Sequence, residues 1–124
     1  MPPKSTNPLS FLPLTPFAFQ VLLALADGDR HGYAIIKEVE ERSGGQVTLR
    51  TGTLYTLLQR LLDEQLISEV EAPSAAADKP EDSRRRYYSL SPLGDAVLRS
   101  EAQRLEALIG VARRKHVLSD TSGV

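Results

Sequence analysis

The chain has 124 residues, 41% of them hydrophobic and 25% charged, which favours one folded domain over a disordered chain. It contains no cysteine and two histidines, so its composition excludes disulfides, thiolate-bound zinc and Fe–S clusters. No apolar run reaches the ~18–20 residues that span a bilayer and no signal peptide is evident, so we expect a cytoplasmic protein with no membrane partner.

The net charge of −1 conceals an uneven distribution of charged side chains. Residues 63–83 contain seven acids and one lysine, whereas residues 84–124 contain eight arginines and lysines and four acids. A near-zero net charge argues weakly against nucleic-acid binding, because a basic excess is the usual signature of that function. It also gives little electrostatic repulsion between copies, which suits a protein that self-associates.

The first residues predict an arm followed by a buried helix. We expect residues 1–12 to form an arm that is flexible or packs on a partner subunit. Thr15 followed by Pro16 is a helix-start signal, because the hydroxyl can cap free amides and proline tolerates the first helical position. The apolar stretch 17–26 predicts a helix buried on all sides, which Gly28 ends.

A second helix is predicted from His31 to about Ser43, and the glycine pair 44–45 ends it. A single histidine before a helix is more often a capping or loop residue than a DNA contact, and both interpretations are kept for His31. Residues 46–50 form a short bridge in which a minimal strand of Val47 and Leu49 is conceivable.

Residues 51–67 predict the central helix of the chain, with Thr51 as its N-cap. Its apolar face is formed by Leu54, Leu57, Leu58, Leu61 and Leu62. Its opposite face carries Gly52, Thr53, Thr56, Gln59, Arg60 and Asp63. That face has no acid before Asp63, as a helix that enters a negatively charged groove requires. The periodicity alone also fits an ordinary core helix with a mildly polar face.

A β-hairpin is predicted next, from alternating residues in two short stretches. The strands are 67–71 and 84–90, and the acidic, proline-containing segment 72–83 is expected to be a mobile loop between them. Because side chains alternate along a strand, we expect one of Tyr87 and Tyr88 to lie in the core.

The last element predicted is a long helix over 91–115, with Ser91 and Pro92 as its start signal and a disordered tail after it at 116–124. Its apolar stripe is Leu93, Val97, Leu98, Ala102, Leu105, Leu108, Ile109 and Ala112, whereas Arg99, Glu101, Arg104 and Glu106 are expected largely off it. About 24 residues span ~36 Å, which is longer than a small helical core covers. The excess apolar length is therefore expected to pack against a second copy.

Three helices followed by a hairpin are typical of a winged helix-turn-helix domain, here mainly α with a small β-hairpin. The segments HGYAIIKEVEE, TGTLYTLLQRLLDEQLI and RRRYYSLSPLGDAVL resemble the PadR family of bacterial transcriptional regulators over about residues 13–112. The resemblance implies a homodimeric winged-helix DNA-binding protein, and we expect a repressor that binds a palindromic operator, because a two-fold dimer holds its recognition helices about one DNA turn apart. The resemblance also implies dimerisation through the C-terminal helix with help from the first helix, and in several members release by a small aromatic ligand.

Residues 13–90 are thus expected to form the DNA-binding domain, with 67–90 as its wing, and residues 91–115 the dimerisation helix. The expected contacts with double-stranded DNA are Tyr33, Lys37, Thr51, Gly52, Thr53, Tyr55, Thr56, Gln59, Arg60, Arg84, Arg85 and Arg86. The expected dimer contacts are Leu14, Phe17, Val97, Leu98, Leu105, Leu108, Ile109 and Ala112.

Several of these assignments have a simpler structural alternative. Tyr55 fits equally a half-buried aromatic residue, and the arginines 84–86 fit an edge strand protected by charge or paired with acids of the neighbouring strand. The sequence has no nucleophile–base pair, phosphate-binding glycine loop or metal-ligand cluster, so we expect neither catalysis nor a cofactor. The alternative function is a winged-helix module that binds protein and has little affinity for DNA.

Overall fold

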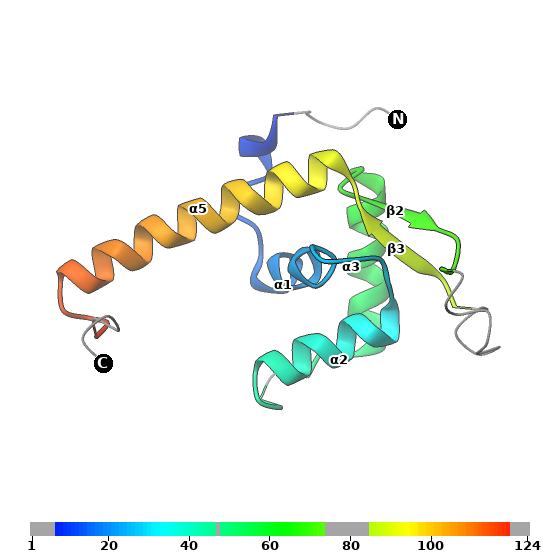
Figure 1. The fold of residues 1–124 in the computed structure, drawn as a ribbon, viewed down its shortest axis with the longest axis horizontal. Coiled ribbons are helices and arrows are strands. Elements are labelled where there is room, and N and C mark those ends of the chain that lie inside the picture. Colours follow the sequence, from blue (N-terminus) through cyan, green and yellow to red (C-terminus); the bar gives the residue numbers. More distant parts are fainter. Residues whose placement is uncertain (1–6, 47, 74–84, 120–124) are drawn as a thin grey trace.

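The computed structural model describes residues 7–46, 48–73 and 85–119 (Figure 1). In these ranges the chain is mainly helical with a small antiparallel sheet, which confirms the expected fold class. The elements are η1 (Pro8–Phe11), α1 (Pro16–Ala24), β1 (Arg30–His31), α2 (Gly32–Arg42), α3 (Thr51–Asp63), β2 (Ile67–Val70), β3 (Tyr87–Leu90) and α5 (Pro92–Arg114). Most of the predicted loop 72–83, Arg84, Val47 and the end of the tail lie outside the described residues.

Side chains cap three of the α-helices. The Thr15 hydroxyl accepts a hydrogen bond from the Ala18 N–H at 3.2 Å, and the Ser91 hydroxyl accepts one from the Gly94 N–H at 2.9 Å. His31 caps α2, because its Nδ1 accepts from the Ala34 N–H at 3.1 Å. These bonds confirm the two predicted start signals and the capping role of His31.

The predicted N-cap of α3 is wrong by one residue. Arg50 has the extended backbone of an N-cap, and its carbonyl accepts from the Leu54 N–H at 2.9 Å, but its side chain does not cap the helix. Thr51 is already the first helical residue, so its hydroxyl is not placed to cap the amides of the first turn. The first turn of α3 therefore keeps its amide groups available.

The sheet has the order β1–β3–β2, and all of its strands are antiparallel. Ile67 pairs with Leu90 and Val70 with Tyr87, which confirms the predicted hairpin, although β3 starts at Tyr87 rather than at residue 84. The two-residue strand β1 was not predicted, and it makes β3 the central strand. Tyr87 and Tyr88 are both buried, but of the two only Tyr88 belongs to the hydrophobic core cluster, as expected for one tyrosine of the pair. Tyr87 packs against the His31 ring of β1, with ring centroids 5.2 Å apart. This contact covers Tyr87 on the face of the sheet opposite to Tyr88.

The core joins the helices, the sheet and the first turns of α5. The leucine face of α3 is buried as predicted, with Leu54, Leu58 and Leu61 at its centre. Helix α1 is not buried on all sides, because Phe17 and Leu23 are 37% and 36% exposed. The other main core side chains are Val21, Leu22, Ile35, Val39, Leu49, Leu66, Ile67, Tyr88, Val97 and Leu98.

The described part of the arm lies on α5 of its own chain (Figure 1). The Leu14 N–H donates to Oε2 of Glu101 at 2.9 Å, and Arg104 Nε donates to the other carboxylate oxygen at 2.5 Å. Glu101 is 1% exposed, so the expectation that it lies off the buried stripe is wrong. It follows Val97 and Leu98 by one helical turn and therefore continues their face. Its hydrogen bonds satisfy the buried carboxylate.

A close contact fixes the start of α5 against the end of α3. The Ser91 N–H donates to the Leu66 carbonyl at 3.1 Å, and the Ser91 hydroxyl donates to the Gln65 carbonyl at 2.7 Å. A Cβ atom built on Gly94 would lie 1.9 Å from the Leu66 carbonyl oxygen, so only glycine fits there. This junction sets the direction of α5 relative to α3.

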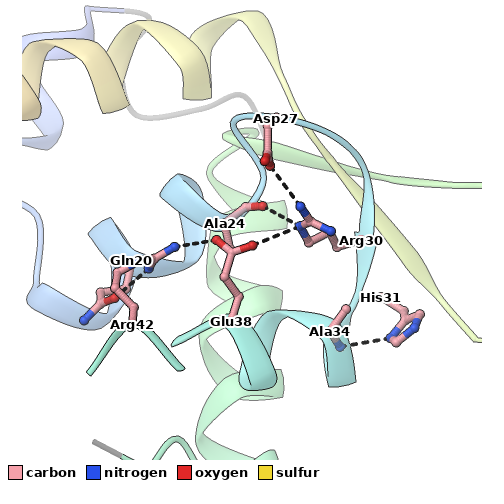
Figure 2. A network of polar contacts seen from close by, with 8 residues as sticks. All are labelled: Gln20, Ala24, Asp27, Arg30, His31, Ala34, Glu38 and Arg42. Atoms are coloured by element: carbon pink, nitrogen blue, oxygen red, sulfur yellow. Dashed lines mark hydrogen bonds and ion pairs between the residues drawn. The ribbon is translucent and has the colours of Figure 1, made fainter. Parts of the chain in front are cut away.

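A polar network holds β1 and α2 to α1. Figure 2 shows Arg30 between the end of α1, where its Nε donates to the Ala24 carbonyl at 2.9 Å, and Glu38 of α2 at 3.3 Å. Arg42 pairs with the same Glu38 and donates to the Gln20 amide oxygen at 2.7 Å. Because these side chains are partly solvated, each bond stabilises by at most about 1 kcal/mol, and their main effect is to orient the elements.

Candidate nucleic-acid interface

The outer face of α3 is exposed along its whole length. Every residue of that face before Asp63 that the sequence assigned to DNA contact is exposed, namely Thr51, Gly52, Thr53, Thr56, Gln59 and Arg60. Two acids at the end of the helix hold the longer side chains: Gln59 donates to Asp63 at 3.0 Å, and Arg60 lies 3.6 Å from Glu64. The first turn contains no acid and no side-chain cap, so its amides and the helix dipole favour an anion there.

An aromatic residue flanked by two cations lies at the start of α2. The Lys37 ammonium is 5.8 Å and the Arg85 guanidinium 5.2 Å from the ring centroid of the exposed Tyr33. Arg85 also approaches both ring nitrogens of His31 at 3.4 Å. We call His31, Tyr33, Lys37 and Arg85 the Tyr33 cluster. It combines residues of α2 with the base of the wing and presents positive charge to solvent.

Tyr55 connects α3 to the start of α2, where this cluster lies. A Cβ atom on Gly32 would lie 2.7 Å from the Tyr55 hydroxyl, so the hydroxyl packs directly against the first residue of α2. The ring remains partly exposed. Tyr55 thus marks the flank of α3 that faces the Tyr33 cluster, and it fixes how far α3 stands from α2.

Arg85 and Arg86, at the base of the wing, have different partners. Arg86 Nη2 lies 2.9 Å from the Glu69 carboxylate, and this hydrogen bond raises the pKa of Arg86 above its ordinary value. This is the cross-strand pairing that the sequence allowed for one arginine of the run. Arg85 instead belongs to the Tyr33 cluster, and Arg84 lies outside the described residues.

Three residues assigned to the dimer contact have another environment in the structure. Val97 and Leu98 are buried in the core of their own chain and have little surface left for a partner. Phe17 lies beside the other flank of α3, where it lines a groove with Gly52, Thr53, Thr56, Leu57 and Arg60. Periodicity placed these side chains on an apolar face but gave no information about which element covers it.

The distal part of α5 forms a second exposed surface. The end of this helix extends beyond α1 and the rest of the domain (Figure 1), and Leu108 and Ile109 are 53% and 42% exposed. Ala112 continues this stripe with partial burial. A groove between α1 and α5 lies next to it, lined by Leu14, Pro16, Phe19, Leu23, Glu101 and Leu105 among others.

Other kinds of site receive no support from the described ranges. Among residues 7–46, 48–73 and 85–119, no group of histidine, cysteine, aspartate and glutamate side chains is placed to hold a metal ion. None of the helices in these ranges is long and apolar enough to cross a membrane.

Comparisons with known proteins identify the family. The model of the transcriptional regulator PadR-like family matches residues 21–100. A PadR family transcription regulator from Clostridium difficile has 26% identity and a TM-score of 0.68, over 81% of this chain and 97% of that one. The complex structure of hsRosR-S4 has 26% identity and a TM-score of 0.63, over 90% of each chain.

A sequence relative extends well beyond the matched region. An uncharacterized 37.1 kDa protein in transposon TN4556 of Streptomyces fradiae is 40% identical over 90 residues. The match covers 73% of this chain and 23% of that protein, so this chain corresponds to about a quarter of its length.

Together with the family match over residues 21–100, the fold establishes that the chain belongs to the PadR-like family of transcriptional regulators, which are DNA-binding proteins and not enzymes.

Proposed function

We propose that the protein is a homodimeric repressor that binds a palindromic operator in double-stranded DNA through the outer face of α3. The observation that carries the proposal is the position of this face, which has no acid before Asp63 and which Tyr55 joins to the start of α2, where the cations of the Tyr33 cluster lie. An α-helix fits into the major groove of DNA, which is about 12 Å wide. The Tyr33 cluster would then lie on the neighbouring phosphates.

Residues of α3 divide into phosphate contacts and base contacts in this proposal. Thr51, Gly52 and Thr53 surround the free amides of the first turn, which suit a phosphate oxygen. Gln59 and Arg60 are long enough to read adenine and guanine edges with two hydrogen bonds each. Their present bonds to Asp63 and Glu64 are exposed i,i+4 pairs worth ~0.3–0.5 kcal/mol. A bidentate base contact gives ~1–3 kcal/mol of discrimination against the wrong base, so these weak intrahelical pairs are only a small obstacle to base reading.

Phosphate binding is assigned to the Tyr33 cluster, with Tyr55 beside it. Lys37 is exposed and Arg85 is partly exposed, and both lie over the Tyr33 ring, whereas Arg86 pairs with Glu69. A net charge of −1 does not oppose this assignment, because charges beyond ~8–10 Å are screened at physiological ionic strength. The local charge at the surface therefore decides phosphate binding.

Dimerisation is assigned to the distal part of α5. Leu108, Ile109 and Ala112 would pack on the partner, with the groove that contains Leu14 and Leu105 at the edge of the contact. Burying one large apolar side chain contributes ~1.5–3 kcal/mol. In this proposal residues 13–90 bind DNA and the helix from Pro92 holds two α3 helices about one DNA turn apart, ~34–36 Å.

Repression would follow from occupation of the operator, and a small aromatic effector would release the DNA. We place this effector in the groove between α1 and α5, where Leu14, Phe19, Leu23 and Leu105 supply an apolar lining. A ligand there would alter how the two protomers meet and thus the spacing of their α3 helices.

The test begins with selection of bound fragments from the source genome, followed by fluorescence anisotropy on a selected site and on random DNA. Arg60→Ala should weaken binding to the selected site by about tenfold to hundredfold and to random DNA much less. Arg99→Ala is the matched control, since Arg99 is exposed on α5 and pairs with Asp95 at 2.8 Å. Equal losses on both DNAs would contradict base reading by Arg60, and no binding even at low salt would favour a protein-binding module.

A further inference from the structure

One apolar side chain on the proposed DNA-binding side has no role in the function described so far. Phe17, at the first turn of α1, is 37% exposed and lines the groove beside α3 with Gly52, Thr53, Thr56, Leu57 and Arg60. A single exposed phenylalanine is common and indicates nothing by itself. Its neighbours are informative, because four of them, all except Leu57, belong to the face that would enter the major groove.

The backbone holds Phe17 firmly in this position. The Thr15 hydroxyl caps the helix and Pro16 occupies its first position, so the first turn of α1 is well defined. Ala18, Val21 and Leu22 are fully buried and anchor the helix to the core. The ring is therefore presented by a rigid element, which is the requirement for a residue that discriminates between bases.

The groove combines apolar surface with one cation. Phe17 and Leu57 supply hydrocarbon, Thr53 and Thr56 supply methyl groups next to hydroxyls, and Arg60 supplies the positive charge. None of the six residues that line the groove is acidic. This charge complements DNA, and the apolar part complements the one apolar group in the major groove, the C5-methyl of thymine.

We propose that Phe17 is a specificity-determining residue that contacts the C5-methyl of a thymine next to the base read by Arg60. This proposal rests on the proposed function, since it requires α3 to lie in the major groove. The methyl would enter the groove between the ring and the threonines of α3. Each half-site of the operator then has one position where thymine is preferred for its methyl group.

The experiment replaces thymine by deoxyuridine, which lacks only the methyl, at each thymine of the selected operator. At one position per half-site the wild-type dimer should bind the deoxyuridine operator about fourfold more weakly, as expected for one buried methyl-sized group. Phe17→Ala should bind both operators equally at that position. Val117→Ala is the control, because Val117 is an apolar side chain with 79% exposure that lines neither the groove beside α3 nor the groove between α1 and α5. Its ratio between the two operators should equal that of the wild type.

Other results separate this proposal from the function on which it rests. Wild-type discrimination that persists in Phe17→Ala would overturn the role of Phe17 and leave DNA binding intact. A Phe17→Ala protein that becomes monomeric in analytical ultracentrifugation would assign Phe17 to the dimer contact and overturn the proposal. Failure of the wild type to bind any DNA would overturn both proposals together.

Discussion

The outer face of α3 and the distal surface of α5 are both exposed parts of long amphipathic helices, but they differ in chemistry. On α3 the leucines at the centre of the apolar face are buried in the core. The exposed face carries threonine hydroxyls, the Gln59 amide and the Arg60 guanidinium. On α5 the apolar stripe continues past the core, so Leu108 and Ile109 remain uncovered within the described chain. The first surface suits a polyanion with hydrogen-bonding edges, and the second suits a copy of the same protein.

On α5, Glu101 lies between the buried part of the apolar stripe and its exposed part. Val97 and Leu98 before it are buried, and Leu108 and Ile109 after it are exposed. Glu101 itself is buried and accepts a hydrogen bond from the N–H of Leu14, which follows the arm. The same periodicity therefore serves the core of one chain at its start and the proposed partner at its end.

The largest expected effect comes from the junction that joins these two helices. In Gly94→Ala the new Cβ would overlap the Leu66 carbonyl, which must then move, and the free energy of unfolding should fall by about 3 kcal/mol. Chemical denaturation measures the change. Gly110→Ala on the same helix is the control: its Cβ would meet only Arg114 at 3.6 Å, and Ala should match Gly or stabilise by up to ~1 kcal/mol. An unchanged midpoint for Gly94→Ala would show that the junction is not rigid.

The next effect concerns the distal surface of α5 alone. Leu108→Asp should weaken the dimer by about 2 kcal/mol or more, roughly thirtyfold, because the charge would be buried against the partner. Sedimentation would then show monomers that retain their circular dichroism spectrum. Gln103→Asp adds the same charge at an exposed position outside the stripe and should leave the dimer unchanged. A persistent Leu108→Asp dimer would refute the distal surface as the interface.

The smallest expected effect is the pH dependence contributed by Glu101. Its hydrogen bonds with Arg104 and the Leu14 amide hold the pKa of Glu101 below its ordinary value, although burial opposes them. The carboxylate therefore stabilises the fold above the unfolded pKa of about 4.3, and this contribution is lost as pH falls through the lower folded pKa. Glu101→Gln should lower Tm near pH 7, with the difference from wild type narrowing below about pH 4. A pH-independent difference would contradict this role.

The sequence was sufficient for most local features, although it placed the N-cap of α3 one residue too late. Thr15 and Ser91 were recognised as caps from adjacent prolines, and the leucines of α3 from their spacing. The environments of the other residues depend on contacts with residues that are distant in the sequence. Glu101 is bonded to an amide 87 positions away, and Phe17 owes its place to side chains of α3.

The sheet shows the same limit. A strand as short as β1 has no detectable alternation, yet it gives β3 a neighbour on each side and buries both of its tyrosines. For the interface, the sequence indicated the polar face of α3 and the residues of α2 separately. Their connection through Tyr55 and Gly32, and the division of work between Arg85 and Arg86, required the structure.

The salt dependence of DNA binding tests the central claim most directly. For the wild-type dimer on its selected operator, log K should fall linearly with log salt concentration, with a slope of about −0.9 for each phosphate contact. In the Lys37→Ala/Arg85→Ala variant the slope should be shallower by about one for each contact removed, on specific and random DNA alike. A slope equal to that of the wild type, or binding that does not respond to salt, would contradict the account of α3 and the Tyr33 cluster as the DNA-binding surface.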